Sequence, residues 1–104
     1  MLLPESKFLV DKVGITDRTK DGKHEFQTIV LLKPGYTNEF GEKIADDDLF
    51  ECKAWNKTLQ EMPVLKHGDK VSALLNMQGR KWINKEYGNT NYQVQLTIRK
   101  ITVL

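Results

Sequence analysis

Apolar and polar residues alternate in several short segments of this chain, and turns rich in glycine, proline and aspartate separate those segments. Alternation with a period of two is typical of β-strands that bury one face. Three such segments come first and two more follow a gap; they cover residues 7–16, 24–32, 49–55, 68–78 and 92–104. Within the second, residues 28–32 are apolar nearly throughout, which predicts a strand covered on both faces. The pattern therefore predicts five strands in one domain that spans residues 1–104.

The connections between these segments carry recognisable turn signals. Asp21-Gly22 lies in the loop 17–23, and Gly88-Asn89 lies in the stretch 79–91, which is predicted to form a hairpin arm. Pro34-Gly35 opens a long polar connection over residues 33–48. Loops of about 15 residues are more often functional or mobile than inert.

The segment 49–55 is predicted to place a tryptophan on a polar face. Its even-numbered residues, Phe50, Cys52 and Ala54, form the natural core face. The opposite face then carries Leu49, Glu51, Lys53 and Trp55. Trp55 is therefore expected to be at least partly exposed.

The last two segments make a second prediction of this kind. The inward residues of 68–78 are Val71, Ala73, Leu75 and Met77, and those of 92–104 are Tyr92, Val94, Leu96 and Ile98. The apolar parity then changes to Ile101 and Val103, which predicts a β-bulge near Arg99-Lys100. If Gly79 does not shift the register, Arg80 and Trp82 face outward with Ser72, Leu74, Asn76 and Gln78.

One helix is predicted, between the third and fourth strands. Within 56–67, Asn56 is the expected N-cap, Leu59, Met62 and Leu65 form an apolar stripe, and Pro63 limits the length to about two turns. Three strands, a short helix and two strands favour an all-β OB-fold, a closed five-stranded Greek-key barrel, over an open sandwich. An SH3-like barrel or another small α+β fold is also compatible with this order.

The charge is unevenly distributed along the 104 residues. Residues 1–48 hold seven Lys/Arg and ten Asp/Glu, a net −3, whereas residues 49–104 hold nine and four, a net +5. The cationic second half suits a polyanionic partner. No apolar run approaches the ~18 residues that span a bilayer, and no signal peptide is visible, so a cytoplasmic protein without membrane contact is expected.

The chain offers little for catalysis, metal binding or a cofactor. Cys52 is the single cysteine and lies on the predicted core face, and His24 and His67 have no partners at ligand spacing. The run Asp46-Asp47-Asp48 lacks the interleaved ligands and glycine of a calcium loop. It is interpreted as a solvated loop or as a guard that repels nucleic acid. No enzyme activity, metal or cofactor is predicted.

Aromatic residues interleaved with cations carry the functional prediction. Trp55 and Trp82 reach outward faces by independent counts, and Lys53, Arg80, Lys81 and Lys85 accompany them. Unpaired bases stack on aromatic rings at about 1–3 kcal/mol each, while cations follow the phosphates. This combination predicts binding of a single-stranded nucleic acid with little sequence preference.

Five pieces of the chain, clearest between Leu49 and Ile98, resemble the bacterial and phage single-stranded DNA-binding proteins of the SSB type. They are "FECKAW", "NKTLQEMPVL", "KHGDKV", "LLNMQGRKW" and "NYQVQLTI". The resemblance implies base-stacking roles for Trp55 and Trp82, with Arg80 and Lys81 beside the backbone, and places Tyr36 where the family often has a further stacking aromatic. Tyr87, Lys53, Lys57 and Lys85 complete the predicted nucleic-acid-binding set. Homodimers or homotetramers that act in DNA replication, recombination or repair are the corresponding expectation.

The chain also departs from that family. Leu49 stands where a stacking tryptophan is frequent, and the chain ends in its last strand at Leu104 without the long acidic-tipped tail. A divergent, phage or plasmid-like member is therefore expected. The rival hypotheses are an OB-fold accessory replication subunit that uses its exposed aromatics as a subunit interface, an RNA-binding protein and, with least support, an enzyme.

Overall fold

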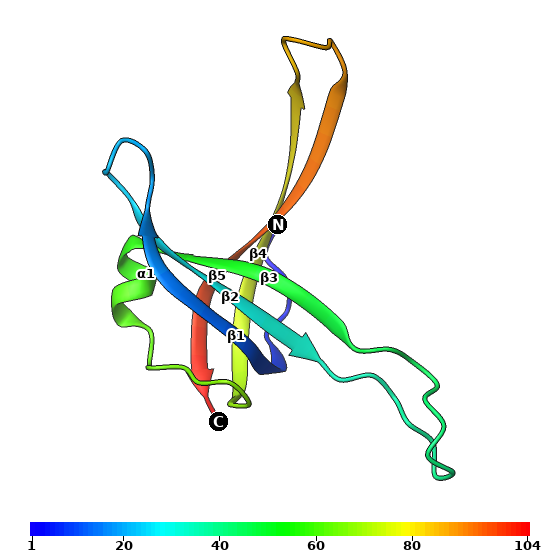
Figure 1. The fold of residues 1–104 in the computed structure, drawn as a ribbon. Coiled ribbons are helices and arrows are strands. Elements are labelled where there is room, and N and C mark those ends of the chain that lie inside the picture. The colour runs from blue at the N-terminus through cyan, green and yellow to red at the C-terminus, as the bar shows by residue number, and fades with distance from the viewer.

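The computed structural model describes all residues from Met1 to Leu104 and contains five strands and one helix. The elements are β1 (Ser6–Arg18), β2 (Glu25–Lys33), β3 (Asp48–Trp55), α1 (Asn56–Glu61), β4 (Lys70–Ile83) and β5 (Thr90–Val103). The strands close into a barrel in the order β1-β2-β3-β5-β4, and α1 connects β3 to β4 (Figure 1). This arrangement confirms the predicted all-β OB-fold with one short helix.

Strand β5 lies between β3 and β4 and closes the barrel. It pairs in parallel with β3, with Cys52 opposite Leu96 and Lys53 opposite Thr97, and antiparallel with β4 along its whole length. The other pairings, β1 with β2, β1 with β4 and β2 with β3, are all antiparallel. Trp55 and Trp82 therefore belong to strands that are separated by β5.

The core is made by alternate residues of all five strands, as the hydrophobic pattern predicts. Cys52 and Ala54 are completely buried on the inward face of β3, and Phe50 is half-buried. In β2 the burial is one-sided, because Ile29 and Leu31 are completely buried while Thr28, Val30 and Leu32 are half-exposed. The prediction that both faces of this strand are covered was therefore only partly correct.

The predicted bulge in the last strand is confirmed. Leu74 pairs with Lys100 and Leu75 pairs with Ile98, so Arg99 is an extra residue on β5. This insertion reverses the parity of the strand and allows both Ile98 and Ile101 to point into the core.

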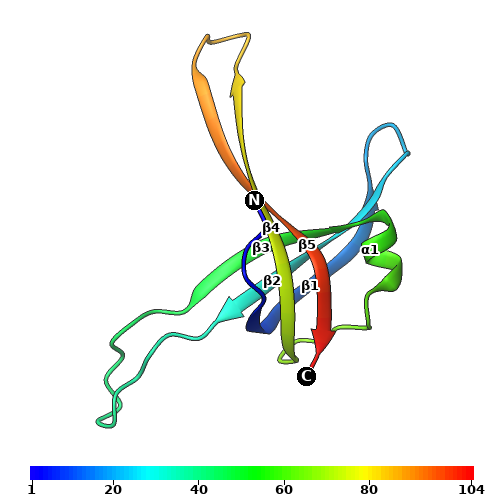
Figure 2. The ribbon, with the colours of Figure 1, turned by 180° about the vertical axis from the view of Figure 1, so that it is seen from behind.

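Two residues of β5 do not face the core as predicted. Tyr92 is 77% exposed and Val94 is 66% exposed, although both have the parity of the buried Ile98. On the N-terminal side of Leu96, toward the hairpin turn, the β4–β5 pair leaves the barrel and continues as a two-stranded ribbon (Figures 1 and 2). The inward-parity face of this ribbon has no core to cover.

The helix ends near Pro63 as predicted, but Asn56 is not its cap. Asn56 is the first residue of the helix and has a positive φ of 44°, a conformation that asparagine tolerates better than most residues. Its side chain accepts a hydrogen bond from the backbone N–H of Glu25 at 3.0 Å and lies 3.0 Å from Nδ1 of His24. Asn56 therefore ties the helix to the start of β2.

The N-terminal segment runs alongside β4 as a short extended stretch. The N–H of Leu3 donates to the carbonyl of Leu75, and the N–H of Met77 donates to the carbonyl of Met1. The terminal amine donates to Oδ1 of Asn76 at 3.1 Å. This segment covers Asn76, which is buried although its parity had predicted an outward, exposed side chain.

Two arms project from the barrel in different directions (Figures 1 and 2). The hairpin arm comprises residues 79–94, with its turn at Gly88, whose φ of 71° requires a residue such as glycine. The acidic arm comprises residues 34–47, between β2 and β3. Both were predicted as connections, and the structure shows that each one projects away from the barrel.

Candidate nucleic-acid interface

The outward side of the β3–β5–β4 sheet continues without interruption onto one face of the hairpin arm. The register between β4 and β5 runs unbroken from Leu75 to Ile83, so Gly79 does not shift it. Side chains on this face come from every second residue of each strand. On β4 and β5 they are Gln78, Arg80, Trp82, Asn91, Gln93, Gln95 and Thr97, while Asn76, which has the same parity, is covered by the N-terminal segment.

Trp82 occupies the outer end of this face. It lies opposite Asn91 on the ribbon, and half of its surface is exposed. Arg80 lies one alternation closer to the barrel, opposite Gln93. An exposed indole beside a guanidinium gives a stacking surface and a phosphate contact within one strand.

Trp55 occupies the inner end, where β3 runs into α1. Its ring packs against Phe26 with 4.9 Å between the centroids and a tilt of 41°. The ammonium of Lys53 lies 4.8 Å from the Phe26 centroid and 5.8 Å from that of Trp55, within reach of a cation–π attraction. This contact holds a positive charge beside a half-buried aromatic pair.

The stretch between the two tryptophans is polar and carries one acid. Gln93, Gln95 and Thr97 line it on β5, and Glu51 shares the outward face of β3 with Lys53. Amide and hydroxyl groups can donate to phosphates or bases, whereas the exposed Glu51 carboxylate opposes a polyanion.

The two indoles mark the ends of a long surface. Trp82 is level with Asn91 of β5, and Trp55 is level with the region of Arg99, because Lys53 pairs with Thr97. Eight residues at a rise of roughly 3.3 Å separate these positions by roughly 25 Å along the strand. One base cannot reach both rings, but a strand of several nucleotides that follows β5 can.

The structure distributes the other predicted residues around this face. Lys85 and Tyr87 lie in the turn at the tip of the hairpin arm, and Tyr87 is exposed. Lys57 lies on α1, two residues after Trp55, and forms an exposed ion pair with Glu61 at 3.8 Å. These three stay close to one end of the outward face or the other.

Two predicted residues are not brought together with the rest. Lys81 alternates with Arg80 and Trp82 and so projects from the opposite face of the ribbon, across from Tyr92. Tyr36 is exposed on the acidic arm, which leaves the barrel in another direction (Figure 1).

Phe26 lies at this site although it is not among the residues predicted from the sequence. Its position opposite Trp55 follows from the β2–β3 register, in which Thr28 also lies opposite Lys53. Phe26 shares its parity with Thr28 and is opposed to the buried Ile29 and Leu31. That alternation within residues 24–32 was the signal that could have placed Phe26 on the outward face.

Cys52 offers no reactive thiol to this surface. The thiol of Cys52 is completely buried, and burial, with a smaller contribution from the charge of Glu51, raises its pKa to about 12. A thiol of this kind is protonated at neutral pH and is not a nucleophile. No group of three or more His, Cys, Asp or Glu side chains is arranged to hold a metal ion. No helix has both the length and the apolar character that spanning a membrane requires.

No protein-family model and no curated protein matches the sequence significantly. Solved structures do match. The small single-stranded DNA-binding protein of Streptomyces coelicolor is 12% identical, with a TM-score of 0.60 over 99% of this chain and 93% of its own. The wild-type single-stranded DNA-binding protein of Thermus aquaticus is 16% identical, with a TM-score of 0.60 over 96% of this chain.

A deletion mutant of the Thermus protein gives a TM-score of 0.62 at 16% identity and over 96% of this chain. The chain spans only about half of the length of the Thermus proteins, whose matched share is 50%. At these identities the likeness establishes a shared fold, the OB-fold of single-stranded DNA-binding proteins.

Proposed function

We propose that this protein binds single-stranded DNA with little sequence preference, without catalysis, in replication, recombination or repair. The observation that carries the proposal is the continuous outward face of β3, β5 and β4, which has an accessible indole at each end. Trp55 and Trp82 stack bases, and Lys53 and Arg80 contact the phosphates between them. The fold shared with solved single-stranded DNA-binding proteins supports the same conclusion.

The remaining predicted residues extend this interface. Lys57 lies beside the Trp55 end, and Lys85 and Tyr87 lie at the tip of the hairpin arm. A strand of DNA that passes either tryptophan reaches these side chains next. Lys81 and Tyr36 project elsewhere, so we assign them no stacking or phosphate contact on this face. A cytoplasmic site of action and a homo-oligomeric state belong to the same proposal.

The decisive experiment is a titration of fluorescently labelled oligo-dT followed by anisotropy, which does not depend on the tryptophan signal. We expect Trp82→Ala to weaken binding by about 1–3 kcal/mol, because one stacking surface is lost. Trp82→Phe keeps a ring and should recover most of the affinity. Val64→Ala, at an exposed valine outside the interface, serves as the matched control.

Two further versions of this titration separate the rival hypotheses. Binding that weakens steeply with salt and is absent for duplex DNA supports the proposal, because phosphate neutralisation releases counterions. Competition between oligo-dT and oligo-U decides between DNA and RNA as the natural ligand. An unchanged affinity in Trp82→Ala, with light scattering that shows lost self-association instead, would assign the tryptophan to a subunit interface.

A further inference from the structure

The molecule is more extended than a compact domain of its size. Its radius of gyration is 16.2 Å and its principal extents are 52 × 35 × 23 Å. A compact chain of this length has a radius of gyration of about 13 Å. The excess comes from the two arms, which leave the barrel in different directions and do not meet (Figures 1 and 2).

The hairpin arm has a second face, opposite to Arg80 and Trp82, and this face is apolar. Ile83, Tyr92 and Val94 lie on it and are each more than 60% exposed, with Lys81 across from Tyr92. An isolated two-stranded ribbon is only marginally stable in water. A bare apolar face on such a ribbon indicates a surface that is covered in use.

This apolar face continues into a cavity at the mouth of the barrel. Val94 belongs to both the face and the cavity, which has a volume of about 360 Å³. The other residues that line it are mostly apolar: Leu3, Ser6, Phe8, Lys33, Phe50, Leu75, Met77 and Leu96. The face and the cavity together form one apolar surface with lysines near its edges.

The acidic arm is ordered by its own hydrogen bonds. The N–H groups of Tyr36 and Ala45 each donate to the carbonyl of the other at 3.1 Å, and Oδ1 of Asn38 accepts from the N–H groups of Phe40 and Glu42. Gly35 allows the two sides to approach, since a Cβ there would lie 2.0 Å from the carbonyl oxygen of Ala45. A preformed arm loses little conformational entropy when it binds.

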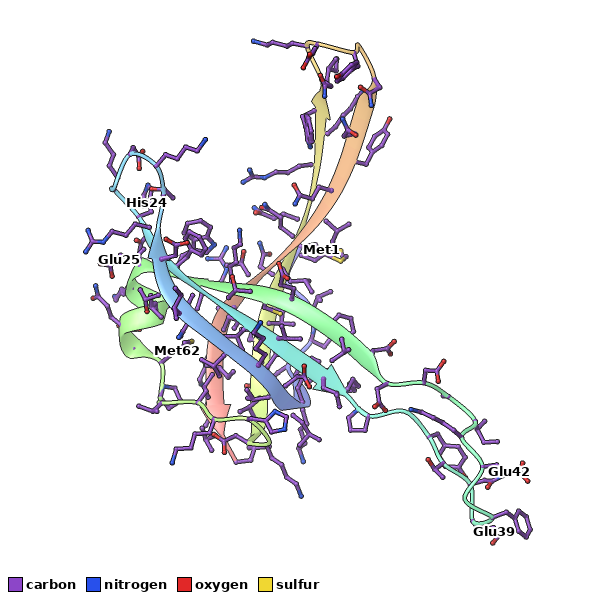
Figure 3. All side chains as sticks on the ribbon, viewed as in Figure 1. Met1, His24, Glu25, Glu39, Glu42 and Met62 are labelled. Atoms are coloured by element: carbon purple, nitrogen blue, oxygen red, sulfur yellow. The ribbon has the colours of Figure 1, made fainter.

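The tip of the acidic arm presents apolar side chains surrounded by acids. Phe40 is 77% exposed and lies in sequence between Glu39 and Glu42, which are at the tip of the arm (Figure 3), and Ile44 is exposed two residues after Glu42. Residues 34–47 contain four acids and one lysine, a net charge of −3. Residues 79–94 contain three cations and one acid, a net charge of +2; Arg80 lies on the opposite face, and Lys81 is the cation across from Tyr92 on the apolar face. The two arms are therefore complementary in both charge and apolar character.

We propose that the acidic arm of one copy of this chain docks on the apolar face of the hairpin arm of a second copy. Phe40 and Ile44 cover the apolar surface around Val94 and Tyr92, while Glu39 and Glu42 pair with Lys81, which lies across from Tyr92. An apolar centre with a charged rim is the usual composition of a protein interface. Because the arms of one chain diverge, the partner is a second copy.

The contact leaves the face of Arg80 and Trp82 open. Every copy carries one acidic arm and one apolar face, so the contact is head-to-tail and either closes into a ring or continues as a chain. This self-association gives the homo-oligomeric state proposed above a specific contact, and it can be measured without nucleic acid.

Sedimentation velocity without nucleic acid tests the proposal. We expect the wild-type chain to associate at low salt and to dissociate as salt rises. Phe40→Ser on the arm and Val94→Ser on the face should each weaken association at least tenfold. Val64→Ser, at an exposed valine of the connection after α1, is the matched control and should associate normally. A monomeric wild-type chain, or unchanged association in both variants, overturns the proposal.

A mixing experiment identifies which surfaces meet. The Phe40→Ser chain keeps an intact face and the Val94→Ser chain keeps an intact arm, so an equimolar mixture should form a dimer and nothing larger. In the same way, a Glu39→Lys/Glu42→Lys chain should pair with a Lys81→Glu chain at low salt. A mixture that behaves as the sum of its separate components contradicts the arm-to-face contact.

Discussion

The two ends of the β4–β5 pair have opposite surroundings. Near the C-terminus of β5, Ile98 and Ile101 lie on either side of the bulge at Arg99, fill the core and are almost completely buried. On the same strand and with the parity of Ile98, Tyr92 and Val94 are exposed because no other strand covers them. The two strands pair at both ends, but core packing stabilises the barrel end, while only the β-ladder stabilises the hairpin end.

This difference suggests a division of labour. The barrel end contains the core and orients the two strands. The hairpin arm has a proposed binding surface on each face and contributes nothing to the core. Substitutions in the arm should therefore alter binding with little loss of stability, and those in the barrel should do the reverse.

The largest expected contrast lies within β5 itself. Ile98→Ala should lower the free energy of unfolding by about 2–5 kcal/mol, because it leaves a cavity in a closed core. Val94→Ala on the same face should change it by no more than about 0.5 kcal/mol. Urea unfolding followed by circular dichroism measures both, and equal losses would contradict the separation of barrel from arm.

The barrel should also respond to alkaline pH through Cys52. Its folded pKa of about 12 lies above the ordinary value of 9.0, so the native state retains a proton that the unfolded state releases. Stability is therefore full below pH 9 and falls between pH 9 and about 12, by up to about 1.4 kcal/mol per pH unit.

Comparison of urea unfolding at pH 8 and pH 10.5 for the wild type and Cys52→Ala isolates this effect. The alanine variant lacks the thiol, while all other ionisable groups are common to both proteins. A pH dependence of equal size in the two proteins would rule out the contribution of Cys52.

The cations of the hairpin arm should contribute to the salt dependence of DNA binding. Arg80→Ala should reduce the slope of log binding constant against log salt by about 0.7 for single-stranded DNA, since one phosphate contact is lost. Lys66→Ala, in the connection between α1 and β4, removes a charge away from the proposed face and should leave the slope unchanged. The measurement is a series of oligo-dT titrations at several salt concentrations.

The smallest expected effect concerns the one acid on the proposed face. Glu51→Gln removes a charge that opposes the DNA backbone, and affinity should rise by about 0.2–1 kcal/mol at low salt. Asp69→Gln is unsuited as a control because Oδ2 of Asp69 accepts a backbone hydrogen bond from Lys66. Glu86→Gln, in the turn of the hairpin arm, shows instead whether removing an acid that lies near the face, but not on it, raises the affinity for DNA by the same amount.

Much of the fold could be predicted from the sequence because alternation and turn residues are local signals. The core face of β3, the bulge at Arg99 and the turn at Gly88 all follow from parity or from residue type. The same parity failed at Tyr92 and Val94, because alternation indicates which face a residue takes and not where the barrel ends.

The candidate site could also be predicted only as far as local alternation indicates the direction of each side chain. The outward direction of Trp82 followed from counting, and the structure preserves it. The pairing of Phe26 with Trp55 and the opposite direction of Lys81 depend on strand register and on the extent of the ribbon. The role of Asn56 depends on a neighbour 31 residues away, which no local pattern contains.

The extended segment from Met1 to Leu3 has a practical consequence for purification of this protein. Met1 lies where the hairpin leaves the barrel, beside Asn76, and Leu104 lies at the other end of β5 (Figure 1). An affinity tag fused ahead of Met1 would replace the amine that binds Asn76 and crowd the base of the hairpin. A tag placed after Leu104 emerges away from both tryptophans and from the arms.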